Sequence, residues 1–328
     1  LLGDIKRWIE RKEIITILGV RRAGKTTLLF EIISYLINTK KIPSENILFI
    51  KADDERADKE DLINKAIDEY FKWRSPNGRI FIFIDEVQEI DEWQRVLKRI
   101  YDLEQGKRKI FISGSNSSFL KAELSYLLTG RFAYFELFPF SFREFLIAKG
   151  VKIKNENDLL RLRNQIRRNL IEYISFGGFP EIVLEPDEQR KEELLRFYFD
   201  SILFRDVAKR KNIRNIDKIT KLTEWYLQNI ASSVNFSNLG KFLELTTDSV
   251  VEYSRYLEEA YLIFIINLFA YSLKKQFINP KKVYCIDPGI RRIVGFVFSE
   301  DVGRIYENTV LIELKSCLLY TSDAADEL

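Results

Sequence analysis

The stretch Glu13–Thr27, EIITILGVRRAGKTT, constrains the fold more than any other part of the chain. Its first half, Glu13–Leu18, is a short apolar run rich in β-branched residues, which predicts a buried strand. Its second half, from Gly19 to Thr26, fits the pattern G-x-x-x-x-G-K-[ST] at every fixed position. Thr27–Ile33 then has helical periodicity. A strand, a glycine-rich loop and a helix in this order predict a P-loop in an α/β fold.

Each position of this loop has an expected task in phosphate binding. Glycines at both ends let the backbone turn, so that its N–H groups and the helix N-terminus form a positive hollow. Lys25 is expected to reach the β- and γ-phosphates of a nucleotide, and the Thr26 hydroxyl to bind Mg²⁺. A chance glycine turn is the alternative, but it does not explain why motif and context agree. The predicted nucleotide-binding residues here are Gly19, Arg21, Arg22, Ala23, Gly24, Lys25, Thr26 and Thr27.

A second nucleotide-site signal follows in Arg79–Glu86, RIFIFIDE. Its apolar residues predict a buried parallel strand, which places Asp85 at the carboxyl edge where ligands bind in open α/β sheets. Asp85 is expected to hold Mg²⁺ through water, and Glu86 to polarise the attacking water as general base. Ordinary solvated acids at a strand end are the alternative. Ser115, which follows another apolar strand at Lys109–Ser113, is expected either to sense the γ-phosphate or to belong to a helix-capping turn.

Composition excludes several other classes of site. The 328 residues include no histidine and only two cysteines. Ser-His triads, zinc sites and a disulfide framework are therefore not expected, and the scarcity of cysteine suits a reducing, cytoplasmic compartment. The net charge of +3 is too small to imply a nucleic-acid partner by itself. No apolar stretch is long enough to span a membrane, so no membrane partner is expected.

Beyond the α/β core the chain carries a helix-turn-helix pattern and basic runs. Asn235–Glu259 predicts two helices, and Tyr261–Tyr271 and Lys282–Ile286 predict two strands with a lysine-rich turn, Lys274–Lys282, between them. This order is typical of a winged helix. The second helix is acidic, which disfavours reading of a major groove, whereas the wing keeps contact with a DNA backbone open. Two basic runs offer the same contact or are solvated helix faces: Arg161, Arg163, Arg167 and Arg168, then Lys209, Arg210, Lys211, Arg214, Lys218 and Lys221.

Taken in order, these stretches resemble one family. GVRRAGKTTLL, IFIDEVQEIDEWQ, IFISGSNSSFL, LLTGRFAYFELFPFSFREFL, FGGFPE, YLEEAYLI and KKVYCIDPGIR are similar to the prokaryotic AAA-type ATPases with a C-terminal domain of unknown function. The resemblance implies a P-loop sheet with strand order 5-1-4-3-2, followed by a helical segment and a winged helix. It also implies that Arg131, before the fifth strand, is an arginine finger offered to a neighbouring subunit of a homo-oligomer. A surface arginine at a strand start is the alternative.

The resemblance also sets the expected domain boundaries. Residues 1–150 would form the AAA-type core, 151–225 the helical segment and 226–300 the winged helix. Residues 301–316 resemble the start of a nuclease-like domain of the PD-(D/E)XK kind that is cut short, so residues after about Gly303 are expected to be poorly ordered, and no nuclease activity is expected. Residues 317–328 resemble a translated transposon-type sequencing adapter, which would be an artefact.

The sequence therefore predicts Mg²⁺-dependent binding and hydrolysis of ATP by a molecular switch or motor. No N-K-x-D signature for guanine is present, which favours ATP over GTP. The expected catalytic residues are Lys25, Glu86 and Arg131, and the expected metal ligands are Thr26 and Asp85. The alternatives are a DNA-binding regulator in which ATP only sets conformation, and a P-loop phosphotransferase. A water-activating carboxylate next to Asp85 favours hydrolysis over transfer.

Overall fold

The computed structural model describes residues 1–104, 106–115, 130–267, 280–294 and 302–318. Contacts divide the chain into two compact units. The first comprises residues 1–19 and 24–137, and the second comprises residues 20–23 and 138–328. The division after residue 137 precedes the expected core boundary at residue 150, and all later residues belong to one unit. Among the helices that the structure describes, none has both the length and the apolar composition needed to cross a bilayer.

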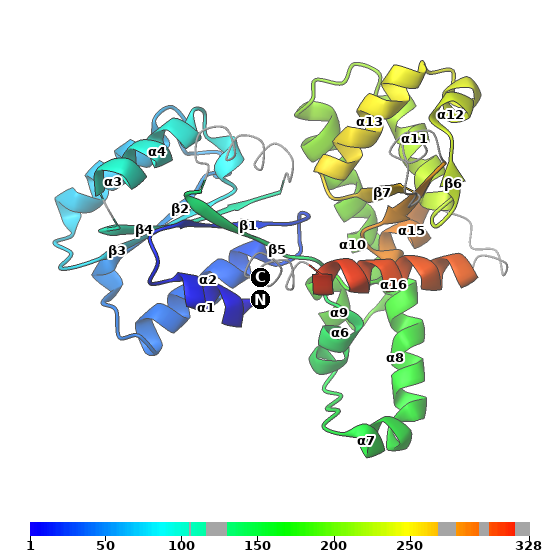
Figure 1. Ribbon diagram of the computed structural model, residues 1–328, viewed down its shortest axis with the longest axis horizontal. Helices are drawn as coiled ribbons and strands as arrows, with labels where there is room; N and C mark the ends of the chain where they lie inside the picture. Colours follow the sequence, from blue (N-terminus) through cyan, green and yellow to red (C-terminus); the bar gives the residue numbers. More distant parts are fainter. Residues whose placement is uncertain (105, 116–129, 268–279, 295–301, 319–328) are drawn as a thin grey trace. The chain divides into compact units, whose positions relative to one another are not determined.

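The first unit is built on a five-stranded parallel sheet (Figure 1). Its strand order, β2-β3-β4-β1-β5, is the predicted order 5-1-4-3-2 counted from the opposite edge. Parallel sheets are buried on both faces, and β1 and β3 are buried along their whole length, as the sequence predicted. The strands are β1 (Ile14–Leu18), β2 (Ile47–Lys51), β3 (Ile80–Asp85), β4 (Arg108–Gly114) and β5 (Phe132–Glu136).

Helices cover both faces of this sheet. Figure 1 shows α1 and α2 on one face and α3 and α4 on the other. Under α1 and α2, alternate strand residues form a core in which the rings of Phe83 and Phe111 stack with centroids 4.4 Å apart. This core holds α1 and α2 on the sheet. The helices are α1 (Leu2–Trp8), α2 (Lys25–Asn38), α3 (Leu62–Trp73) and α4 (Trp93–Glu104), with 3₁₀ turns at Ser44–Asn46 and Val87–Glu89.

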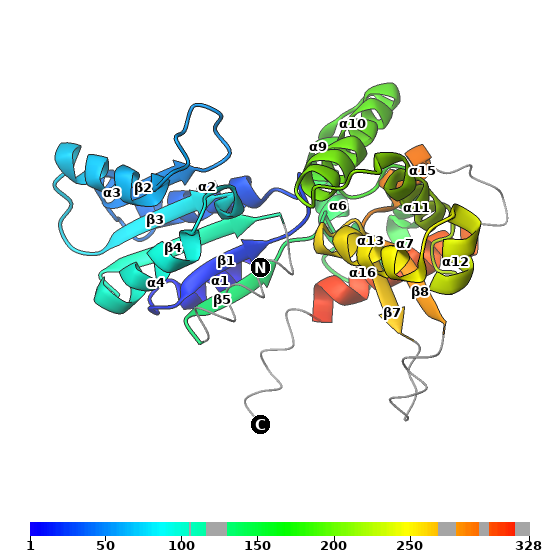
Figure 2. The same cartoon turned by 90° about the horizontal axis from the view of Figure 1, so that it is seen from above.

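The second unit is mainly helical (Figure 2). It carries a small antiparallel sheet of order β6-β8-β7. The predicted helix pair and strand pair are present in this unit as α12, α13, β7 and β8. Of the predicted wing, Lys274–Lys282, residues 274–279 lie outside the described residues, and Lys281 and Lys282 are the first two residues of β8. The elements are α6 (Phe142–Ala148), α7 (Glu156–Arg161), α8 (Arg163–Phe176), α9 (Pro180–Leu184), α10 (Glu188–Asp200), a π-helix (Ser201–Lys209), α11 (Ile216–Gln228), β6 (Ser233–Val234), α12 (Phe236–Leu243), α13 (Thr247–Glu259), β7 (Ile263–Asn267), β8 (Lys281–Cys285), α15 (Pro288–Val294) and α16 (Val302–Leu318).

The last described helix corrects one expectation, because residues 303–318, which were expected to be poorly ordered, belong to α16 and pack within the second unit. Asn308 on α16 is fully buried, and its side chain accepts a hydrogen bond from the Cys285 backbone N–H (2.7 Å) and donates one to the Cys285 carbonyl (3.0 Å). Glu313 accepts a hydrogen bond from the Phe142 backbone N–H at 2.6 Å. The expectation of poor order was wrong because the helix finds its partners on β8 and α6.

Candidate functional site

The central strands of the first unit end side by side at one edge of the sheet. Leu18 of β1 is in register with Gly114 of β4, and Ile84 of β3 is in register with Ile112 of β4. In parallel sheets, the residues that follow such strands collect at the carboxyl edge, which is where ligands bind. The P-loop, the Asp-Glu pair and Ser115 all follow these strands, as predicted.

The backbone of the loop depends on glycine at both ends. Gly19 has φ 157°, and a Cβ on this residue would lie 2.2 Å from the Leu137 carbonyl oxygen, so a side chain does not fit. Gly24 has φ 100° and directly precedes α2, so it can enter the helix from a left-handed conformation. The first N–H groups of a helix have no partner within the helix, and together with the helix dipole they favour an anion at the start of this 14-residue helix.

Lys25 and Glu86 form a buried ion pair at this edge. Lys25 Nζ lies 3.4 Å from Glu86 Oε1, and the two side chains are only 3% and 11% exposed. The same Nζ donates a hydrogen bond to the Gly19 carbonyl oxygen at 3.1 Å. Glu86 has φ 54°, a left-handed conformation that a non-glycine residue adopts only where its surroundings hold it. The two residues predicted to clamp phosphate and to activate water therefore meet at one place.

Thr26 and Asp85 provide two oxygen ligands beside this pair. The Thr26 hydroxyl donates to Asp85 Oδ2 at 2.7 Å, and the Ser113 hydroxyl donates to the other carboxylate oxygen. Burial raises the pKa of Asp85, and the hydrogen bonds from Ser113 and Thr26 offset part of that rise. Among the described residues, no group of three or more His, Cys, Asp or Glu side chains could hold a metal ion alone. A hydroxyl and a carboxylate instead fit Mg²⁺, which takes one or two protein ligands and shares phosphate oxygens.

Two further residues of the site were missed from the sequence. The Ser113 hydroxyl accepts a hydrogen bond from the Glu86 backbone N–H at 3.0 Å, so it holds both acids of the Asp-Glu pair. The Gln88 amide donates to the Glu86 carboxylate and lies 3.3 Å from the hydroxyl of Ser115, which is 1% exposed. A serine at the end of the apolar run IFIS was the available signal for Ser113. The polar residue two positions after Glu86 was the signal for Gln88.

The two loop arginines are engaged within the second unit, to which residues 20–23 belong. Arg21 donates two hydrogen bonds of 2.9 Å to Asp206, which lies on the π-helix and is 2% exposed. Arg22 has φ 71°, lies 3.7 Å from Glu181 and places its guanidinium 5.4 Å from the ring centroid of Tyr198. These side chains bind protein groups, so any nucleotide contact from these two residues falls to their backbone.

Arg131 lies apart from the Lys25 and Glu86 cluster. Its carbonyl accepts a hydrogen bond from Ile14 at the start of β1, which places it at the amino edge of the sheet, opposite the P-loop. Its guanidinium lies 3.1 Å from Asp102 and 5.7 Å from the ring centroid of Tyr101. The structure therefore does not bring this predicted catalytic residue to the nucleotide site of its own chain.

Comparisons with known proteins cover both units. A family model described as an AAA domain matches residues 11–146, and one described as a domain of unknown function matches residues 167–300. An uncharacterized protein of Methanocaldococcus jannaschii is 35% identical over 95% of this chain and 68% of its own length. An uncharacterized protein of Haemophilus influenzae is 32% identical over 92% of this chain and 74% of its own length.

Two solved structures show a looser similarity. The Aeropyrum pernix ORC1 protein in complex with DNA aligns with a TM-score of 0.38 and 10% identity, over 93% of this chain and 92% of that chain. A DNA polymerase III gamma subunit-related protein from Thermotoga maritima aligns with a TM-score of 0.37 and 15% identity, over 79% of this chain and 99% of that chain. Similarity at this level carries no functional conclusion.

Proposed function

Because the chain belongs to the family of AAA-type P-loop ATPases with a C-terminal domain of unknown function, we propose that it binds ATP with Mg²⁺ and hydrolyses it as a switch or motor. One observation carries this proposal. Side chains from the loop and from the end of β3 converge at the carboxyl edge of the sheet, where Lys25 pairs with Glu86 and Thr26 with Asp85. Each of the two pairs joins a phosphate- or metal-binding group of the loop to a carboxylate of the strand.

The binding residues act by charge and by position. Lys25, the first residue of α2, would hold the β- and γ-phosphates. The oxygens of Thr26 and Asp85 would hold Mg²⁺, which when bound neutralises charge on the transferring phosphoryl group. Asp85 is only 2% exposed, so its carboxylate is shielded from bulk water and contacts the Thr26 and Ser113 hydroxyls.

Glu86 would take the proton of the attacking water. Its carboxylate is held by Lys25 on one side and Gln88 on the other, and its backbone by Ser113. An oriented carboxylate of this kind suits general base catalysis. When phosphate recruits Lys25, the Glu86 carboxylate is released from this ion pair and becomes available to the attacking water, which links nucleotide binding to hydrolysis.

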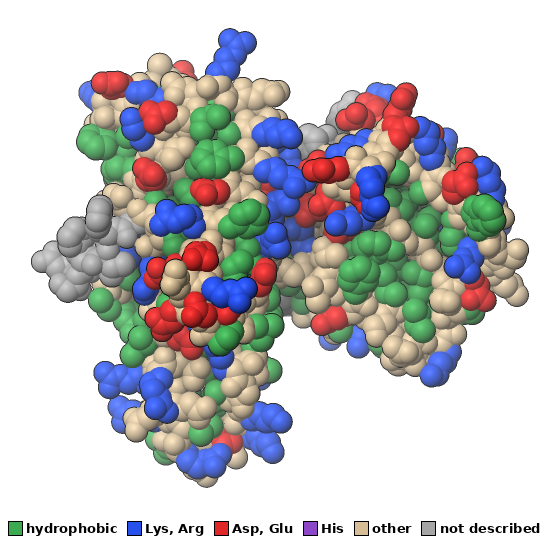
Figure 3. Space-filling model, turned by 180° about the vertical axis from the view of Figure 1, so that it is seen from behind, with side chains coloured by type: hydrophobic (Ala, Val, Ile, Leu, Met, Phe, Trp, Pro, Cys, Tyr) green, Lys and Arg blue, Asp and Glu red, His purple; other side chains and the backbone are tan. Residues whose placement is uncertain are grey.

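The second candidate function is an ATP-switched DNA-binding regulator. We interpret α12, α13, β7 and β8 as a winged helix. Its second helix, α13, is acidic, which disfavours contact with DNA, but two of its acidic residues, Glu258 and Glu259, bond to groups of the protein itself. Glu258 accepts a hydrogen bond from the Ile265 backbone N–H at 2.7 Å, and the carboxylate of Glu259, which is 8% exposed, lies 2.6 Å from Lys211 Nζ. Figure 3 also shows Lys and Arg side chains gathered at the end of this unit where α7 and α8 lie. DNA affinity that falls steeply with salt would favour this candidate.

The test of the main proposal separates nucleotide binding from turnover. Lys25→Ala should abolish ATP binding, because it removes the phosphate clamp. Glu86→Gln should retain binding and lower turnover by about 10²- to 10⁴-fold, because an amide cannot act as the base. Affinity is measured by nucleotide titration and turnover by phosphate release. Glu89→Gln, a change of the same kind in the next turn, should leave both unchanged. Equal loss of affinity in the Lys25 and Glu86 variants would refute the assigned roles.

A further inference from the structure

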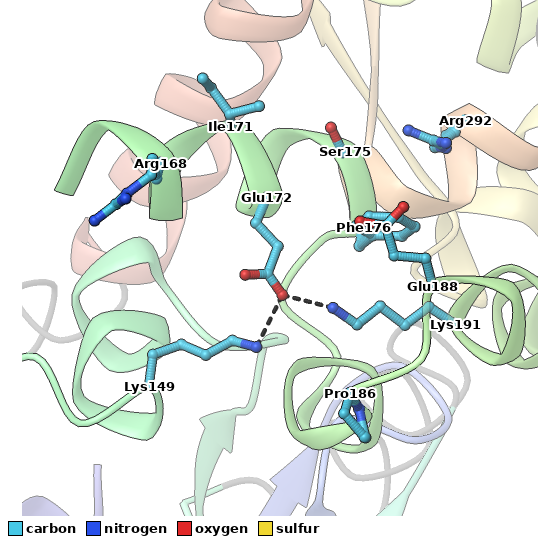
Figure 4. Close-up of a pocket in the computed structure, with 10 residues that line it drawn as sticks. All are labelled: Lys149, Arg168, Ile171, Glu172, Ser175, Phe176, Pro186, Glu188, Lys191 and Arg292. Atoms are coloured by element: carbon cyan, nitrogen blue, oxygen red, sulfur yellow. Dashed lines mark hydrogen bonds and ion pairs between the residues drawn. The ribbon is translucent and has the colours of Figure 1, made fainter. Parts of the chain in front are cut away.

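A second candidate site lies within the second unit, far along the chain from the P-loop. A pocket of about 470 Å³ opens between the residue that follows α6, the part of α8 from Arg168 onward, the start of α10 and α15 (Figure 4). Charged side chains from all four of these segments line it: Lys149, Arg168, Glu172, Glu188, Lys191 and Arg292. A volume of this size falls within the range of small-molecule sites, which is roughly 300–1,000 Å³.

Two lysines share one carboxylate at the centre of this pocket. Lys149 Nζ and Lys191 Nζ lie 2.8 and 2.5 Å from the same oxygen of Glu172, and Figure 4 shows both side chains pointing to it. Burial alone would raise the pKa of Glu172, but the two lysines lower it overall, so the carboxylate is ionised. The triad therefore carries one uncompensated positive charge. The side chains of Lys191 and Lys149 are 4% and 24% exposed, so this charge lies in a partly dehydrated place.

The rest of the lining adds to the positive charge. Arg292 lies 2.8 Å from Glu192 and 4.7 Å from the ring centroid of Phe176, so its charge is largely matched. Arg168 is exposed and, within the described part of the chain, has no ion-pair partner. The lining holds four cations and two carboxylates, and Glu192 supplies a third carboxylate through Arg292. The balance is one to two positive charges, which a single phosphate group would neutralise.

We propose that this pocket binds the phosphate group of a small ligand, with Lys149 and Lys191 at its floor and Arg168 at its rim. Lysine and arginine make charge-assisted hydrogen bonds to phosphate, and these are about twice as strong as neutral ones. The burial of Lys191 favours a small ligand over a nucleic-acid strand, because a continuous backbone contacts exposed groups and gains little from one that is buried. An anion entering the pocket would relieve the excess charge of the triad.

The experiment uses the full chain with Lys25→Ala, so that the P-loop does not bind the probe. Inorganic phosphate, adenosine monophosphate and a single-stranded oligonucleotide are titrated by calorimetry at constant ionic strength. We expect saturable binding of one phosphate or one mononucleotide per chain. If inorganic phosphate binds at least as tightly as adenosine monophosphate, the pocket recognises the free anion. If adenosine monophosphate binds more tightly, the pocket recognises a nucleotide.

Variants locate the binding. Lys191→Met should weaken it by roughly tenfold or more, since a hydrogen bond to a charged group contributes about 1.5–3 kcal/mol. Arg168→Gln, an exposed change that should not affect folding, should weaken it severalfold. Arg167→Gln, its neighbour on α8 outside the pocket lining, should have no effect. The proposal is overturned if phosphate does not saturate, if both arginine variants weaken binding equally, or if the oligonucleotide binds tightest with a steep salt dependence.

Discussion

The two acids of the nucleotide site depend on a single hydroxyl. Ser113 donates to Asp85 and accepts from the Glu86 backbone N–H. Ser113→Ala leaves that buried N–H unpaired, at a cost of about 1–3 kcal/mol, and removes a hydrogen bond that lowers the pKa of Asp85. Because Mg²⁺ needs the ionised carboxylate, the rise of ATP turnover with pH should shift to higher pH, and more Mg²⁺ should be required.

The measurement is phosphate release against pH at several Mg²⁺ concentrations. Ser34→Ala on α2, which removes a hydroxyl that takes part in an exposed hydrogen bond with Asn38, is the matched control. An unchanged pH profile in Ser113→Ala would show that this hydroxyl does not set the ionisation of Asp85.

Asp287 gives the second unit a dependence of stability on pH. Its carboxylate is fully buried and accepts hydrogen bonds from the backbone N–H groups of Gly178 (2.7 Å) and Gly289 (2.8 Å). Burial raises its pKa from 3.8 to about 7, against the smaller opposing effect of these bonds. Between these two pKa values, the folded state holds a proton on Asp287 that the unfolded state has released. The stability that this protonated carboxyl contributes is therefore complete below about pH 4 and is lost as pH rises to about 7.

Urea unfolding midpoints between pH 5 and pH 8 test this. The midpoint of the unchanged protein minus that of Asp287→Asn should fall as pH rises, because the carboxyl ionises and asparagine cannot. A difference that stays constant with pH would show that Asp287 is ionised throughout. Taking the difference removes the contributions of every other titrating group.

The predictable part of the site is the part fixed by local chemistry. Lys25, Thr26 and Asp85 lie at motif positions whose neighbours along the chain determine their geometry, so they could be placed from the sequence. Ser113 and Gln88 could not, because their hydrogen bonds depend on the register between β3 and β4. The side-chain partners of Arg21 and Arg22 could not be predicted either, since Asp206 and Glu181 follow more than 150 residues later in the chain.

The same division holds for whole elements. The parallel strands could be predicted because apolar runs such as Ile80–Ile84 are long enough to be buried on both faces. The order of the strands came from resemblance, since no local pattern specifies which strands pair. The packing of α16 was mispredicted because its anchors, Asn308 and Glu313, bond to groups on β8 and at the start of α6. A helix whose partners lie that far away looks unsupported in its own sequence.

Docking of α16 can be tested at Asn308. Asn308→Ala removes both partners of the Cys285 backbone, whose N–H and carbonyl are buried. Each group left unpaired costs about 1–3 kcal/mol, so the urea midpoint should fall clearly. Val310→Ala, on the exposed face of the same helix, should change it little. Equal midpoints for the two variants would mean that α16 is not held on β8.

At the scale of the whole molecule, the open question is whether the nucleotide site is complete within one chain. Arg131 lies at the sheet edge opposite the P-loop and forms an ion pair with Asp102 of its own unit. Any contact between its guanidinium and a nucleotide would therefore have to be made in another copy of the protein. We propose such an arrangement, in which each chain supplies an arginine to the transition state of its neighbour.

This arrangement predicts kinetics that a self-contained site cannot give. ATP turnover per chain should rise with protein concentration, and Arg131→Ala should lower turnover without lowering ATP affinity. Arg95→Ala, which breaks an exposed ion pair with Glu92 on the same unit, is the control and should leave turnover unchanged. Mixing Arg131→Ala with Glu86→Gln should restore part of the activity, because a chain with an intact Glu86 then meets a neighbour with an intact arginine. Turnover that is independent of concentration, with no recovery on mixing, would reduce Arg131 to a surface ion pair.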